Sequence, residues 1–182
     1  MSGAHGHADH GGNKGIALLI SVLALVLAFS ETLGKGAQTN ALSYNIEASN
    51  LWAFFQAKTI RQTVLRTAAE QTAVTATGDA AKAQTETWRK TAQRYQTEPE
   101  TGEGRDELAA RAKAAEKKRD ASMAAYHNYE VASAATQIAI VLASASIIAE
   151  IVALVWIAGG LGLVGIAFCA IGFFWPTAVH LF

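Results

Sequence analysis

Glu150 is the residue of this chain whose type and position most suggest chemistry. It is the one charged residue between Ser133 and Phe182, in an otherwise apolar stretch. A carboxylate near the centre of a membrane helix costs about 2.5 to 3.5 kcal/mol, so it normally faces protein or water and has a partner. We therefore consider two roles for Glu150: an ion pair with Lys14 at the membrane edge, or a group that conducts ions or protons. Glu31, which follows the first apolar run, is a second carboxylate of this kind.

The start of the chain is rich in histidine and glycine. His5, His7 and His10 are side chains of a type that binds transition metals, and Asp9 lies beside them. A structural metal site needs ligands that a fold holds in place. Residues 1–14 show no apolar periodicity, so we predict a disordered, solvated tail with at most weak metal binding.

The sequence carries no motif of an enzyme or a cofactor site. It has no Gly-rich phosphate loop outside the apolar segments, no HExxH pattern and no pair of cysteines, since Cys169 is its one cysteine. We predict that the protein is not an enzyme, has no cofactor and holds no structural metal.

Charge is segregated along the chain. The 182 residues include 15 basic and 15 acidic side chains, and every basic residue except Lys14 lies between Lys35 and Arg119. A near-neutral balance does not favour nucleic-acid binding. With two prolines and no period-two alternation, the chain should be almost entirely helical. We predict an all-α membrane protein with lipid as a partner and one extramembrane region.

Three apolar segments have lengths typical of membrane helices. We predict spans at 15–33, 133–157 and 161–182, with a tight turn at Ala158–Gly160 between the last two. A 25-residue helix is about 37 Å long, and the hydrocarbon core of a bilayer is about 30 Å thick.

Small residues recur at spacings of three and four in each apolar segment. This is the period of a helix–helix seam, and close approach through small residues is the usual way in which helices associate in lipid. We predict that these residues pack the three helices, and copies of the chain, together. They are Ala17, Ser21, Ala24 and Ala28 in the first segment; Ala139, Ala143, Ser146 and Ala153 in the second; and Gly162, Gly165, Cys169 and Gly172 in the third. Glu150 lies on the stripe of the second segment, between Ser146 and Ala153.

The first segment also has features of a cleavable signal peptide: a basic start at Lys14, an apolar core, and the small residues Ala28 and Ser30. A segment that is removed needs no packing face. We therefore favour a retained membrane helix.

Residues 34–132 are predicted to form a long helical hairpin. The first arm runs from Ala41 to Ala76, with Leu42, Ile46, Ala53, Ala57, Ile60 and Val64 on one side. Gly78 and Asp79 mark a break, and Pro99 lies in the clearest turn, at residues 97–104. An Ala-rich arm begins at Arg105.

Large aromatic residues need a partner in this hairpin. Antiparallel pairing of the arms puts Trp52 level with residues 111–115, so Trp52, Phe54 and Phe55 are predicted to pack in the hairpin core. The alternative is that residues 51–55 lie on the membrane surface as an interfacial helix.

Three stretches resemble a known family. They are Lys14–Leu25 (KGIALLISVLAL), Ser30–Lys35 (SETLGK) and Ile46–Arg61 (IEASNLWAFFQAKTIR), of which Asn50–Arg61 is the most specific. Together they are similar to the bacterial membrane family called domain of unknown function 4337, over nearly the whole chain. The resemblance implies a bacterial inner-membrane protein with a central helical region, and it implies no activity, cofactor or catalytic residue.

Basic residues near the membrane ends predict orientation. Lys35, Lys117, Lys118 and Arg119 flank the hairpin, and only Lys14 lies on the other side, so we expect the hairpin in the cytoplasm. The leading functional hypothesis is a homo-oligomeric membrane scaffold. The alternatives are an oligomeric channel lined by membrane carboxylates, and a periplasmic helical adaptor released by signal cleavage. The hairpin is also expected to offer a surface to an unidentified protein partner.

Overall fold

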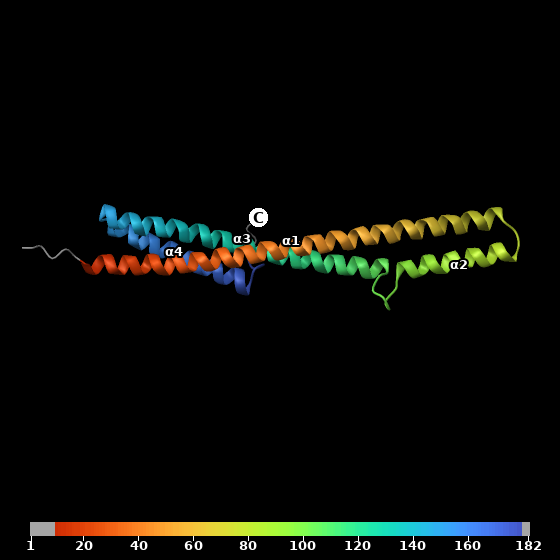
Figure 1. Cartoon of the computed structure of the whole chain (residues 1–182), viewed down its shortest axis with the longest axis horizontal. Helices are drawn as coiled ribbons and strands as arrows, with labels where there is room; N and C mark the ends of the chain where they lie inside the picture. The colour runs from red at the N-terminus through yellow and green to blue at the C-terminus, as the bar shows by residue number, and fades with distance from the viewer. Residues whose placement is uncertain (1–9, 180–182) are drawn as a thin grey trace, which may run out of the picture. The chain divides into compact units, whose positions relative to one another are not determined.

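The computed structural model describes the backbone of residues 10–179 and the side chains of residues 14–179. All regular secondary structure in this described part is α-helical: α1 (His10–Thr75), α2 (Asp79–Gln96), α3 (Arg105–Ala149) and α4 (Val152–Phe174) (Figure 1). The all-α prediction is confirmed. Three of these helices, α1, α3 and α4, are long and apolar enough to cross a membrane.

The chain divides into two compact units. The first, which we call the bundle unit, contains residues up to 41 and from 120 onward, and so holds the start of α1, the end of α3, and α4. The second, the hairpin unit, contains residues 42–119 and holds the rest of α1, α2 and the start of α3. α1 is unbroken at residue 34, where the sequence suggested the end of a membrane segment.

Local sequence explains where most helices end. α1 stops before Gly78, whose φ of 121° lies in a region that residues with a Cβ rarely adopt. α2 and α3 are joined by residues 97–104, where Gly102 has a φ of 67°. Asp106 and Glu107 occupy the first turn of α3, where negative charge is favourable. α4 ends just before Pro176, which cannot continue a helix.

The turn between α3 and α4 lies at Glu150–Ile151, and not at Ala158–Gly160 as the sequence suggested. Ala158 is instead fully buried inside α4. The physical reason is the pairing of small residues on the two helices: Gly172 packs at Tyr129, Gly165 at Thr136, and Ala158 in one cluster with Ala143. These pairs are symmetrical about a turn at residues 150 and 151.

Each unit has its own small core. In the bundle unit, Leu23 is buried with Ala139, Ala143 and Ala158. In the hairpin unit, Leu51 is buried with Leu108 and Ala112. Both cores are built mainly from alanine and leucine, so the helices approach one another closely.

Candidate functional site

The glycines of α4 let this helix pack closely in the bundle unit. A Cβ at Gly162 would meet the side chain of Leu23 on α1, and a Cβ at Gly165 would overlap Thr136 Oγ1 on α3. A Cβ at Gly172 would lie 3.0 Å from Tyr129 Cε1. All three glycines are buried, and Figure 1 shows α1, α3 and α4 running alongside one another here.

The second small-residue stripe lies partly in this core. Ala139 and Ala143 are fully buried and Ser146 is 5% exposed. Ala153, by contrast, is exposed on α4, beyond the turn.

The first small-residue stripe faces away from the bundle core. Ala17, Ser21, Ala24 and Ala28 are all exposed, although the sequence suggested a seam between the three helices. α1 instead turns Leu23 and Ser30, which are 2% and 0% exposed, toward its neighbours. Leu23 fits there because Gly162 leaves room for its side chain. Among the described residues, no other helix of the bundle unit therefore packs against the face of α1 that carries the small residues.

Asn128 is a buried polar residue that the sequence analysis missed. Its side-chain Nδ2 donates to the backbone oxygen of Ala124 at 2.9 Å and to that of Pro176 at 3.0 Å. It thereby ties α3 to the segment that follows α4. These bonds satisfy the buried Nδ2, whereas Oδ1 of the same side chain is buried with no hydrogen-bond partner among the described residues.

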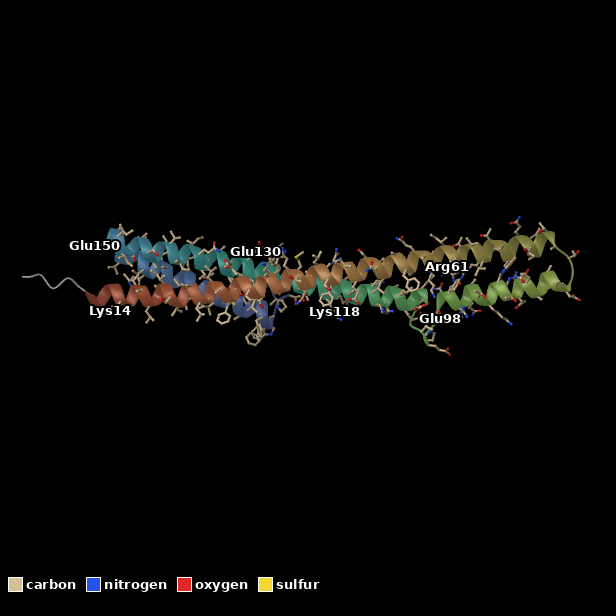
Figure 2. The ribbon with its side chains drawn as sticks, in the orientation of Figure 1. Lys14, Arg61, Glu98, Lys118, Glu130 and Glu150 are labelled. Carbon is tan, nitrogen blue, oxygen red and sulfur yellow. The ribbon has the colours of Figure 1, made fainter. Side chains whose placement is uncertain are left out.

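Glu150 lies in the α3–α4 turn and is exposed, with a φ of 55°. It was expected inside a membrane helix, within the predicted span at 133–157. Figure 2 shows Lys14 and Glu150 at the same end of the bundle unit, but among the described side chains no ion pair joins them. Glu31 is also exposed and accepts a hydrogen bond from Gln137 Nε2 at 3.3 Å. Neither carboxylate is buried in the bundle.

A buried polar cluster fastens the α2–α3 connection to α1 in the hairpin unit. Lys58, on α1, is 6% exposed, and its Nζ lies 3.4 Å from Glu98 Oε2 (Figure 2 labels Glu98). The same Nζ lies 5.2 Å from the centre of the Tyr95 ring. A Cβ at Gly104 would overlap the backbone nitrogen of Glu98, so only glycine fits there.

The cluster continues through two further side chains. Gln62, 2% exposed, donates from Nε2 to the backbone oxygen of Ala92 at 2.8 Å. Arg105 donates from Nη1 to Gln62 Oε1 at 2.6 Å and to Gln96 Oε1 at 2.9 Å. In the sequence these residues look like ordinary solvent-exposed helix residues, but Lys58 does lie in the stretch that carries the family resemblance most specifically.

The aromatic residues of the hairpin divide between core and surface. Trp52 donates from Nε1 to Glu116 Oε1 at 2.9 Å, close to the predicted level of residues 111–115. Trp52 and Phe55 pack against the Leu51 cluster, edge to face with their centroids 5.4 Å apart. Phe54 differs from the prediction because it is 37% exposed. Since Leu51 is buried within the unit, this segment does not form a separate interfacial helix.

Two phenols lie near the end of the bundle unit. Tyr126 donates a hydrogen bond to Glu130 Oε1 at 3.0 Å, and Tyr129 is 5% exposed.

A metal centre has no support within residues whose side chains the structure describes, because no group of three His, Cys, Asp or Glu residues there could hold an ion. The side chains of His5, His7 and His10 lie outside that part.

A family model described as domain of unknown function (DUF4337) matches residues 12–175. The chain belongs to this family. The resemblance carried by Lys14–Leu25, Ser30–Lys35 and Ile46–Arg61 is thus confirmed. No curated protein and no solved structure matches the chain significantly. The DUF4337 match assigns no role to any residue of the chain.

Proposed function

We propose that this DUF4337 protein is a non-enzymatic, integral membrane protein that associates with copies of itself as a scaffold. The observation that carries this proposal is the exposed small-residue face of α1, at Ala17, Ser21, Ala24 and Ala28. Apolar side chains gain little by leaving lipid, so membrane helices associate through close packing at small residues. A small face that the protein's own bundle leaves open fits a helix of another copy.

The bundle unit is the part that we place in the membrane. Its three helices have the length and apolar character of membrane spans, and lipid would cover exposed side chains such as Leu18, Val141 and Ile148. Basic residues flank the hairpin unit, and chain segments on the cytoplasmic side of a membrane usually carry an excess of such residues. We therefore place the hairpin unit in the cytoplasm of a bacterium and the bundle unit in the inner membrane. The α3–α4 turn, with Glu150, then lies on the opposite side of the membrane.

The other two hypotheses receive less support. A channel lined by carboxylates would favour Glu150 inside a helix, facing a pore, whereas Glu150 occupies an exposed turn. A periplasmic adaptor requires removal of the first segment, whereas Leu23 of that segment packs in the bundle core and the family match begins at residue 12.

Co-purification of two differently tagged copies from membranes tests the proposal. The double variant Ala24→Leu and Ala28→Leu fills the small face with larger side chains, so we expect it to recover several-fold less of the second copy than wild type does. Val22→Leu is the control, because Val22 is already large and exposed. Equal recovery of the second copy by the double variant and wild type would contradict the proposed interface.

A further inference from the structure

A second face of α1, in the hairpin unit, exposes apolar side chains. We call Leu42, Ile46, Ala53, Ala57, Ile60 and Val64 the outer stripe. Leu42, Ile46, Ile60 and Val64 are 61%, 53%, 65% and 61% exposed, and the two alanines are exposed as well. The opposite side of the same segment, with Ala48, Leu51 and Gln62, is buried in the hairpin. The outer stripe is thus a second apolar face that α2 and α3 leave uncovered.

The spacing of the outer stripe keeps its residues on one side of α1. Ala53 follows Leu42 by eleven residues, Val64 follows Ala53 by eleven, and Ala57 follows Ile46 by eleven. Eleven residues make three turns at about 3.67 residues per turn, close to the 3.6 of an α-helix, so such a stripe stays on one side of the helix. It extends over about 33 Å at a rise of about 1.5 Å per residue.

The surroundings of the outer stripe favour protein over lipid as its partner. The three charged residues between positions 42 and 64 are Glu47, Lys58 and Arg61, and none of them belongs to the stripe. Helices that lie on membrane surfaces usually carry several basic residues on their polar side. Here Lys58 is buried, so Arg61 is the one exposed basic residue of the segment.

We infer that the outer stripe pairs with the outer stripe of a second copy of this chain, with the two α1 helices parallel and in register. This inference rests on the proposed membrane anchoring and self-association. Two copies inserted in the membrane in the same orientation favour a parallel pair over an antiparallel one, and a twofold axis alongside the two stripes sets each stripe residue beside its own counterpart. Because the stripe is uncharged, this pairing opposes no like charges.

The size of the outer stripe explains why the membrane anchor matters. Six residues on each copy are few beside the roughly 20 to 30 residues a side of a standard stable interface. Paired hairpins alone would therefore associate weakly. Association of the bundle units in the membrane would hold two stripes at high effective concentration, and the second contact would then form without a large binding energy of its own.

Disulfide cross-linking of the full-length protein in native membranes tests this inference. Cys169 is first replaced by alanine, and one cysteine is then introduced as Ile46→Cys or Ile60→Cys. Parallel, in-register pairing predicts covalent dimers on mild oxidation, since each new thiol faces its counterpart within disulfide reach. Glu47→Cys is the matched control: it is exposed and adjacent to Ile46 but lies on another face, so we expect at least tenfold less dimer.

The outcomes separate this inference from the proposed function. If Ile46→Cys and Glu47→Cys cross-link equally, or neither cross-links while the protein still co-purifies with its tagged copy, the outer stripe is not the interface although self-association stands. If wild type does not co-purify with its copy, both ideas fail. Leu42→Cys that cross-links only to Val64→Cys would overturn the parallel arrangement. A second variant, Ile46→Lys with Ile60→Lys, should retain its helical circular dichroism yet lose the Leu42→Cys cross-link.

Discussion

Replacing Gly165 by alanine should destabilise the bundle unit, whereas the same change at Gly160 should stabilise it. At Gly165 the new methyl group would overlap Thr136 Oγ1 and lie 3.1 Å from the backbone oxygen of Ala132. Moving the Thr136 side chain away is unfavourable, because its hydroxyl donates a hydrogen bond to that same oxygen at 2.7 Å. At Gly160 nothing lies within 4 Å of the added atom.

The two free-energy changes should have opposite signs. Forcing an extra methyl group into a packed helix contact costs about 1 to 3 kcal/mol. Alanine is favoured over glycine inside a helix by about 0.5 to 1 kcal/mol. Gly165→Ala should therefore lower the free energy of unfolding by up to about 2.5 kcal/mol once these two effects offset each other. Gly160→Ala should raise it by about 0.5 to 1 kcal/mol.

Reversible unfolding in mixed detergent micelles, followed by far-ultraviolet circular dichroism at rising dodecyl sulfate fractions, measures both changes. The two variants add the same methyl group to the same helix, so any general effect on apolarity is shared. If Gly165→Ala is as stable as Gly160→Ala, the contact between α3 and α4 at Thr136 is not as close as described here.

Three further changes probe other parts of the chain. Glu150→Gly should raise the free energy of unfolding by about 1 kcal/mol, because glycine adopts a φ of 55° without the penalty of a Cβ. Glu150→Gln should leave the free energy of unfolding unchanged, and unfolding in mixed micelles measures both variants. Leu108→Ala should lower stability by about 2 to 5 kcal/mol in thermal unfolding, since Leu108 is fully buried. Lys58→Met should lower the free energy of unfolding by about 1 to 3 kcal/mol and speed hydrogen exchange at residues 97–104, because it removes the ion pair with Glu98. Lys82 is exposed, so Lys82→Met should change neither quantity.

Local sequence rules predicted the helix ends that lie near a glycine or a proline. The break at Gly78 and the turn around Pro99 have strong local causes, and the structure has both. The α3–α4 turn has no such cause, because Glu150 and Ile151 are not typical turn residues. Its place depends on how Gly165 and other small residues fit against α3, which is a tertiary effect.

Periodicity alone could not decide which side of α1 faces its neighbours. The bundle segment of α1 is apolar or small on every side, and the prediction that the small residues such as Ala24 pack the three helices was wrong, because Leu23 lies in the core instead. In the hairpin segment the apolar stripe is exposed, and the buried side includes Lys58 and Gln62. Their burial depends on partners from α2 and from residues 97–105, which are remote in sequence.

Native mass spectrometry of the full-length, detergent-solubilised protein tests the central claim of self-association most directly. Self-association predicts one defined homo-oligomer, whose mass is a whole multiple of the single chain and whose population falls in the Ala24→Leu and Ala28→Leu variant. A monomer at every concentration tested, in a detergent that preserves the helical circular dichroism, would contradict it. The exposed faces of α1 would then have to serve a partner of a different sequence.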